Sequence, residues 1–235
     1  MRRSVGLLGM KRIGLIGGIS WESTSSYYTL LNTMTAKQFG AWKQPALLID
    51  SLDFSEIVAY QQKGDWTTLG EILADAARRL ESGGATVLAI GANTMHKNFD
   101  DVAKAVSIPV VDIRDALARE VKALGASSMA LLGTKYVMET DFFSSHLERA
   151  GVKVVKPVAG QIDILQSIIF DELTQGIVSD ASRRAFLEIA DDCRTRGGDV
   201  VGLCCTEFGL LINEGNAPWP FVDSTVAHVK ALLDH

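Results

Sequence analysis

Two stretches of the sequence share one pattern: Gly83-Gly84-Ala85-Thr86-Val87-Leu88-Ala89-Ile90-Gly91-Ala92-Asn93-Thr94 and Gly197-Gly198-Asp199-Val200-Val201-Gly202-Leu203-Cys204-Cys205-Thr206-Glu207. In each stretch a Gly-Gly pair follows a helical segment, and a short apolar run then ends in polar residues. A continuous apolar run bounded by glycine is typical of a strand buried in a parallel sheet. The polar residues contain a thiol in one copy and Ala92 in the other. They predict a functional site beyond the carboxyl ends of these two related strands.

The same alternation of strand and helix extends over the whole chain. Apolar runs predict strands at 12–16, 46–51, 86–91, 110–111, 129–132, 152–155 and 200–203. Three- and four-residue apolar spacing predicts amphipathic helices at 66–82, 115–124, 139–150, 162–175, 181–196 and 224–233. Strands that alternate with helices indicate an α/β fold, in which ligands bind beyond the carboxyl ends of parallel strands.

The two halves of the chain also repeat each other. Gly14-Leu15-Ile16-Gly17-Gly18 leads into a helix near the start, and Ala130-Leu131-Leu132-Gly133-Thr134 does the same in the second half. We expect two similar lobes, each a mostly parallel sheet flanked by helices, with the active site in the cleft between them. The first lobe is predicted to comprise residues 10–115 and 222–235, and the second 116–221. Residues 1–9 are interpreted as an extension.

Composition limits the class of function. The 235 residues carry a net charge of -5, which gives no basic surface for nucleic acid or an anionic membrane and favours a small-molecule substrate. The three cysteines, Cys193, Cys204 and Cys205, are an odd set with two adjacent members, which argues against disulfides and for a cytoplasmic location. Their spacing does not suit a zinc site. No apolar run reaches the length of a membrane span.

Polar loops after the predicted strands supply candidate binding groups. In the turn Gly17-Gly18-Ile19-Ser20, Ser20 is expected either to cap the next helix or to hold a carboxylate. The glycine spacing does not match the G-x-G-x-x-G pattern of dinucleotide sites. Asn93 and Thr94 offer donors for a carboxylate, although such residues are also ordinary helix caps. His96 taken alone is interpreted as a packing or capping residue.

Cys205 is the strongest candidate for a catalytic residue. A thiol acts through its thiolate, whose usual pKa of about 8.5 falls near a helix N-terminus or a positive group. Neighbouring strand residues point to opposite faces, so only one of Cys204 and Cys205 is expected to face the cleft. The alternative is that a cysteine at a strand end is simply a small buried hydrophobe.

Taken together, these residues give the chain a resemblance to the aspartate/glutamate racemase family of cofactor-independent enzymes. The resemblance covers nearly the whole chain from Met10. It rests on six motifs in order: Gly17-Gly18-Ile19-Ser20-Trp21-Glu22-Ser23-Thr24, Ser51-Leu52-Asp53-Phe54, Asn93-Thr94-Met95-His96, Leu131-Leu132-Gly133-Thr134, Cys205-Thr206-Glu207 and Asp223-Ser224-Thr225-Val226-Ala227-His228.

The resemblance implies a reaction in which two opposed thiols take a proton from the substrate α-carbon and return it. The second-lobe thiol corresponds to Cys205, and the first-lobe thiol corresponds to Ala92, which has no transferable proton. A water or His96 would then have to serve the Ala92 face. The family's substrate-binding arginine is expected at position 46, which is Ala46 here. The resemblance further implies a homodimer that needs neither a cofactor nor a metal.

The function expected from this resemblance is that of an amino-acid racemase or related isomerase acting on aspartate, glutamate or a similar small carboxylate. Cys205 is the expected acid/base, and Glu207 is expected to orient Cys205 or the substrate ammonium. The α-carboxylate is expected to be held by residues around Ser20, Asn93, Thr94, Thr134 and Thr206. Two alternatives stay open: a single-cysteine decarboxylase similar to arylmalonate decarboxylase, and a non-catalytic binding paralogue.

Overall fold

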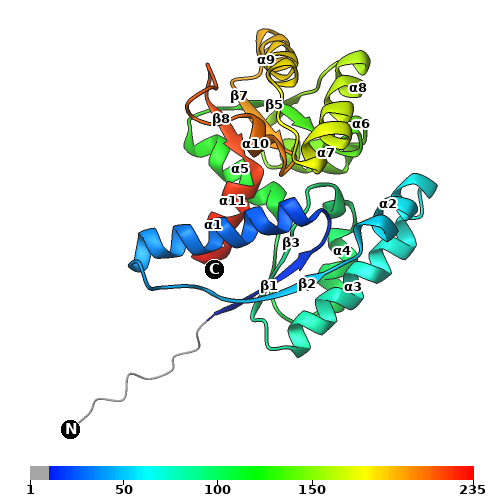
Figure 1. Ribbon diagram of the computed structural model, residues 1–235, viewed down its shortest axis with the longest axis vertical. Helices are drawn as coiled ribbons and strands as arrows, with labels where there is room; N and C mark the ends of the chain where they lie inside the picture. The colour runs from blue at the N-terminus through cyan, green and yellow to red at the C-terminus, as the bar shows by residue number, and fades with distance from the viewer. Residues whose placement is uncertain (1–10) are drawn as a thin grey trace.

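The fold consists of two parallel sheets, one from each half of the chain. The computed structural model describes residues 11–235, so the expected extension at 1–9 lies outside the described residues. The first sheet has the order β2-β1-β3-β4 and the second the order β6-β5-β7-β8, with every pairing parallel. The predicted α/β class with two similar lobes is confirmed (Figure 1).

The strands of the first sheet are β1 (Arg12–Gly17), β2 (Ala46–Ser51), β3 (Val87–Ile90) and β4 (Val110–Val111). Its half of the chain also forms α1 (Trp21–Phe39), α2 (Phe54–Lys63), α3 (Trp66–Ser82), the 3₁₀ helix η1 (Thr94–Asn98) and α4 (Phe99–Ala105). Apolar residues of α3 at three- and four-residue spacing, among them Leu69, Leu73 and Leu80, are buried in one core cluster with Leu88 of β3. This burial fixes α3 against the sheet.

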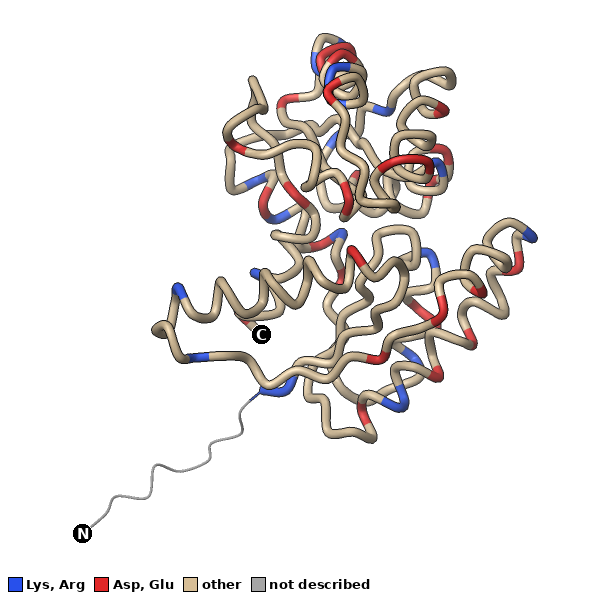
Figure 2. The backbone as a smooth tube through the Cα atoms, viewed as in Figure 1, with Lys and Arg blue, Asp and Glu red and all other residues tan. Residues whose placement is uncertain are grey.

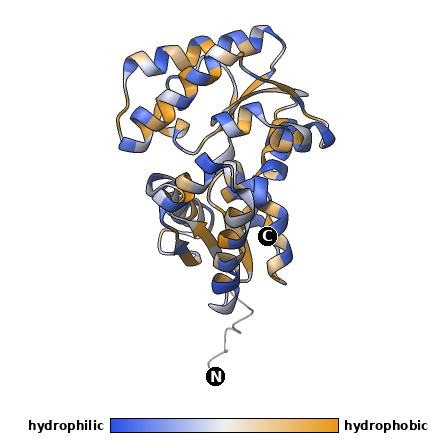
Figure 3. Ribbon diagram, turned by 90° about the vertical axis from the view of Figure 1, so that its right-hand side faces the viewer, coloured by the Kyte–Doolittle hydropathy of each residue, from blue (hydrophilic) through white to orange (hydrophobic). Residues whose placement is uncertain are grey.

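The strands of the second sheet are β5 (Ser128–Gly133), β6 (Lys153–Val155), β7 (Val200–Cys204) and β8 (Phe221–Asp223). The helices of this half are α5 (Ile113–Ala123), α6 (Lys135–Glu139), α7 (Asp141–Arg149), α8 (Ala159–Ser167), α9 (Asp180–Thr195), α10 (Phe208–Leu211) and α11 (Ser224–Asp234), with the short turns η2 (Ile168–Glu172) and η3 (Leu173–Gln175). In Figure 3 hydrophilic and hydrophobic residues alternate along the helices, as expected for helices with one buried face.

Two predicted helices differ from the structure, and α2, α4 and β8 are among the elements that were not predicted. The helix expected at 162–175 is divided into α8, a π-helical turn η2 and the 3₁₀ turn η3. The helix expected at 139–150 is two helices, because α6 ends at Glu139 and α7 begins at Asp141. Strand β8 was not predicted, and its three residues pair with β7. The lobe boundary expected at 222 therefore falls inside a strand of the second sheet.

The last helix connects the two halves of the molecule. α11 leaves the second sheet at β8 and packs against both α5 and α1 (Figure 1). His228 on α11 bonds to Tyr27 of α1 and to the carbonyl of Val111, at 2.7 and 2.9 Å. Acidic and basic residues are interspersed over both lobes (Figure 2). Within residues 11–235, we find no helix with the length and apolarity to cross a membrane.

Candidate active site

The candidate site lies where the two central strands of each sheet end. β1 and β3 are central in the first sheet, and β5 and β7 are central in the second. The loops after these four strands carry all the predicted site residues: Ser20 after β1, Ala92, Asn93 and Thr94 after β3, Thr134 after β5, and Cys205, Thr206 and Glu207 after β7. All eight line one cavity of about 50 Å³. The structure thus brings together side chains that are up to 187 positions apart.

Glu207 is the centre of the hydrogen bonding in this cavity. Its Oε2 accepts from the Cys205 thiol at 2.9 Å and from the Thr206 hydroxyl at 2.7 Å, while its Oε1 accepts from the Ser20 hydroxyl at 2.6 Å. The side chain is buried, with 5% exposure. Because Ser20 comes from the first half of the chain, the carboxylate joins both lobes at the site.

The environment of Cys205 keeps its thiol protonated. Burial, followed by the negative charge of Glu207 and the hydrogen bond to it, raises the pKa of Cys205 well above its usual value. Cys204 packs in a different core cluster from Cys205 but also lines the cavity, so the expectation that only one of the two reaches the cleft is not confirmed. Only Cys205 has a hydrogen bond to Glu207.

Ala92 lines the same cavity as Cys205 and has neither a thiol nor a hydroxyl. His96 does not supply an acid or base there, which corrects the expectation that it serves the Ala92 face. Its Nε2 accepts from the backbone N–H of Ile113 at 3.2 Å, so its Nδ1 donates to the carbonyl of Ala92 at 2.9 Å. Burial is the first cause that lowers the pKa of His96 to about 3. The ring is therefore neutral and fixes the loop.

Ser20 has a strained backbone. Its φ of 62° is the only positive φ found outside glycine in residues 11–235. The hydroxyl accepts from the N–H of Ser23 at 3.1 Å, which caps α1, and donates to Glu207. Strain of this kind costs about 1–3 kcal/mol and is concentrated at functional sites. Ser20 thus acts both as a helix cap and as a partner of the site carboxylate.

Asn93 and the two threonines connect the lobes beside the thiol. The Asn93 amide donates to Ser224 at the start of α11 at 3.0 Å. Its carbonyl oxygen, Oδ1, is buried without a hydrogen-bond partner among the described residues. Thr94 and Thr134 share a hydrogen bond of 2.8 Å between their hydroxyls. A buried acceptor without a partner costs free energy, so Oδ1 is a position for a donor on a ligand.

Comparison with known proteins decides the family. A sequence model of the Asp/Glu/hydantoin racemases matches residues 16–232. The chain belongs to the Asp/Glu/hydantoin racemase family. This match confirms the resemblance found in the sequence.

Relatives of this racemase family share the fold over nearly the full chain. A Yersinia pestis protein assigned to the Asp/Glu racemases is 38% identical with a TM-score of 0.87, and the match covers 96% of this chain and 98% of that one. An aspartate racemase homologue from Pyrococcus horikoshii is 36% identical with a TM-score of 0.85, at the same coverage. The broad-specificity amino-acid racemase RacX of Bacillus subtilis is 19% identical over 94% of this chain and 96% of its own length.

Position 46 lies outside the site of this racemase-family chain. Ala46 pairs with Arg12, at the beginning of β1, whereas the cavity lies beyond Gly17 and Ser51 at the other end of the same two strands. Five strand residues span about 17 Å. The expectation that Ala46 marks a lost substrate-binding arginine is therefore wrong, because the strand places it at the opposite edge of the sheet.

Apart from Ile19 and Cys204, the rest of the cavity is a wall that the sequence did not predict. We call this the far wall: Phe54 and Gln61 of α2, Tyr136 of α6, and Ile169, Phe170 and Thr174 of the η2–η3 segment. The sequence indicated one residue of this wall, since Phe54 belongs to the motif Ser51-Leu52-Asp53-Phe54. No sequence pattern indicated the π-helical turn at η2. π-helical turns are frequent at functional sites.

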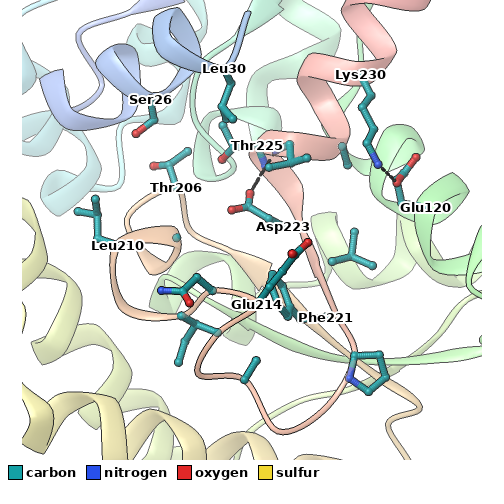
Figure 4. A pocket seen from close by; sticks show the side chains of 18 of the residues that line it. Ser26, Leu30, Glu120, Thr206, Leu210, Glu214, Phe221, Asp223, Thr225 and Lys230 are labelled. Carbon is teal, nitrogen blue, oxygen red and sulfur yellow. Dashed lines mark hydrogen bonds and ion pairs between the residues drawn. The ribbon is translucent and has the colours of Figure 1, made fainter. Parts of the chain in front are cut away.

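Two other features of the described residues are weaker candidates for the site. A groove of about 880 Å³ lies between α1, α11 and β8, with an ion pair between Lys230 and Glu120 at its rim (Figure 4). It contains Thr206 but neither Cys205 nor Glu207. Asp112, Asp115 and His146 form a cluster that could hold a metal ion. Arg114 already binds both carboxylate oxygens of Asp112.

Proposed function

We propose that this protein is a pyridoxal-phosphate-independent amino-acid isomerase in which Cys205 is the single thiol acid/base. The observation that supports this is the buried Cys205–Glu207 hydrogen bond in a cavity that Ala92 also lines. In this proposal the thiol acts on one face of the substrate α-carbon only. The family's racemase activity is the starting point, and the missing second thiol is what distinguishes this chain.

The proposed binding mode uses the groups around the thiol. Backbone N–H groups at Asn93, Thr94, Thr134 and Thr206 would hold the α-carboxylate, since N–H groups at strand ends and helix starts favour anions. The substrate ammonium would lie between Glu207 and the unpartnered Oδ1 of Asn93. Both of these are acceptors, so they suit the three N–H donors of an ammonium group.

The proposed reaction begins with a proton transfer inside the protein. The Cys205 thiol gives its proton to Glu207, which leaves a thiolate and a neutral carboxylic acid. The thiolate removes the α-proton, and the electron pair of the C–H bond stays on the substrate as an enolate-like carbanion. Stabilisation of this charge by fixed dipoles has to supply several kcal/mol. The same thiol then returns a proton to the face from which the first one left, which exchanges the α-hydrogen without inverting the α-carbon. The slower inversion, which makes the reaction an isomerisation, needs a proton from a water on the Ala92 face.

This one-sided reaction predicts that α-hydrogen exchange with solvent is faster than racemisation. Proton NMR in deuterated buffer measures the exchange of each amino acid in a panel, and chiral chromatography measures racemisation. Cys205→Ser should lower both rates by roughly 10²–10⁴-fold. Ala92→Cys, which places a thiol opposite Cys205, should raise racemisation relative to exchange. Equal rates of exchange and racemisation in the wild-type protein would contradict the one-sided proposal.

Decarboxylation is the second candidate, and the protonated state of Cys205 favours it. A thiol with a raised pKa is an acid at neutral pH, and protonating the enediolate left by carbon dioxide loss needs an acid on one face only. The opposing Ala92 suits this reaction equally well. Release of carbon dioxide from disubstituted malonates, without exchange of any amino acid, would favour the decarboxylase over the isomerase.

A further inference from the structure

The part of the cavity that would hold the side chain of a substrate has no positive charge. Among residues 11–235, no lysine or arginine lines the cavity, and Glu207 is the charged residue in its lining. The basic residues next to the site loops have other partners. Lys97 lies 3.9 Å from the ring centre of Trp66, and Lys135 is paired with Asp163 and Glu139 at 3.2 and 3.5 Å.

The two hydroxyl groups of the far wall already have hydrogen-bond partners. The Tyr136 hydroxyl donates to the carbonyl of Gln61 at 3.2 Å, and the Thr174 hydroxyl donates to the carbonyl of Phe170 at 3.0 Å. Each hydroxyl has one proton to donate, so neither can give it to a carboxylate while these bonds persist. The remaining side chains of the wall include the apolar Phe54, Ile169 and Phe170. The wall therefore presents apolar surface, two hydroxyls that are already bonded and the uncharged amide of Gln61, but no cation among its described residues.

An acidic substrate side chain would be poorly held here. Its carboxylate would lose water, meet no cation, and lie in the same small cavity as the Glu207 carboxylate. A buried charge without a partner is costly, and a like charge nearby raises that cost. An uncharged side chain has neither cost and gains from the apolar wall.

We propose that the amino acids accepted by this site have uncharged side chains, in contrast to aspartate and glutamate. This inference rests on the proposed function, since it takes the Cys205–Glu207 end of the cavity as the place where the α-carbon reacts. The α-ammonium and α-carboxylate of a neutral amino acid cancel in charge, so such a substrate leaves Glu207 as the only net charge. The far wall then selects by shape and polarity rather than by an ion pair.

Matched pairs of amino acids test this selectivity. Exchange at the α-carbon is measured by NMR for asparagine against aspartate, and for glutamine and methionine against glutamate. The neutral members should exchange at least 10-fold faster in kcat/KM than the acidic members. Thr174→Lys adds a cation to the far wall and should lower the ratio of kcat/KM between the neutral and the acidic amino acid by 10-fold or more. Thr174→Met, a control of similar length without charge, should leave this ratio unchanged.

Failure of the selectivity and failure of the proposed function give different results. Aspartate or glutamate exchanging as fast as its neutral partner would overturn the selectivity and leave the isomerase proposal standing. Absence of exchange with every amino acid would overturn the isomerase proposal. Thermal-shift titrations then decide the selectivity by binding alone. A rise in Tm with asparagine or methionine but not with aspartate supports it, and a rise with aspartate, or none with either, contradicts it.

Discussion

At the scale of single residues, Glu207 and Cys205 are joined by a hydrogen bond. The carboxylate accepts hydrogen bonds from three side chains, and one of these donors is the thiol that loses its proton in the proposed reaction. The geometry that orients the thiol therefore also raises its pKa. A bound ammonium group beside Glu207 would reduce that effect, so we expect ionisation of the thiol to depend on substrate binding.

Glu207→Gln tests this coupling. The substitution keeps the shape of the side chain but removes the negative charge, so the pKa of Cys205 should fall. The pH midpoint of Cys205 alkylation by iodoacetamide, followed by mass spectrometry of the labelled peptide, should move to lower pH. Thr206→Val is the matched control, since it removes a donor to Glu207 and keeps the charge. A midpoint that is unchanged or higher in Glu207→Gln would show that burial alone sets the thiol pKa.

The sequence predicted which residues gather at one cavity where these residues follow a strand. Ser20, Asn93, Thr94, Thr134, Cys205 and Glu207 all do so, and parallel strands of one sheet end at a common edge. It did worse with side chains whose role depends on what packs over them. Both ring nitrogens of His96 bond to the backbone, so the packing role predicted for the isolated residue fits and the role of proton donor does not. Motif spacing matched Ala46 with the substrate-binding arginine of the family. Such spacing gives no information on which end of a strand faces the site.

At the scale of elements, the turn between β1 and α1 controls the site, because it holds Ser20 in its strained conformation. Gly18 in this turn has φ +74°, and a Cβ there would lie 2.1 Å from the carbonyl oxygen of Leu52. The turn therefore packs against the chain beyond β2. Any shift of this turn moves the Ser20 hydroxyl away from Glu207.

Gly18→Ala should lower the free energy of unfolding by more than about 2 kcal/mol, because the positive φ and the clash with backbone add together. Gly64→Ala is the control, since Gly64 has a similar φ of +71° and a Cβ there would meet no described atom within 4 Å. That control should cost about 1 kcal/mol. Urea unfolding of both variants measures the difference, and equal losses would mean that the clash is relieved at little cost.

Elements that follow a regular period were predicted from sequence, and irregular ones were not. The helix at 66–82 was predicted at its observed bounds because its apolar residues repeat without interruption. The π-helical turn at Ile168–Glu172 adds a residue to one turn, and the apolar pattern of 162–175 continues across it. β8 has three residues beside Pro220, too few for an alternating pattern, and its pairing with β7 is a long-range contact.

At the scale of the whole molecule, two buried imidazoles sit where α11 joins the two halves. His96 and His228 have ring centres 5.7 Å apart. Burial is the first cause that lowers the pKa of His96 to about 3 and that of His228 to about 4. Both rings are neutral in the folded protein at neutral pH. They form part of the packing between the lobes.

The stability of the protein should therefore fall in mild acid. Below the unfolded pKa of about 6.5, the unfolded chain binds protons that the folded chain does not, so stability is lost as pH falls toward 4 and 3. Between pH 6.5 and 5, each imidazole accounts for about 2 kcal/mol at about 1.4 kcal/mol per unit. Urea unfolding at pH 7 and pH 5 measures the loss.

Two variants assign this loss to the buried pair. His228→Gln removes one of the two titrating groups and should reduce the loss between pH 7 and 5 by about half. His146→Gln changes a histidine that lies nearer the surface and pairs with Asp115, and it should retain the full loss. An equal loss in wild type and His228→Gln would show that other groups control the acid sensitivity.

The hydrogen bonds that cross the cavity also set how a substrate enters. Ser20 with Glu207 and Thr94 with Thr134 join the lobes at groups that the proposed substrate also uses. A substrate bound in the proposed way has to break these hydrogen bonds, so the measured affinity is the intrinsic affinity multiplied by the fraction of molecules in which they are broken. The affinity and the chemical step therefore depend on different contacts. A change that only weakens a bond between the lobes tightens apparent binding, while the chemistry at Cys205 keeps its own rate.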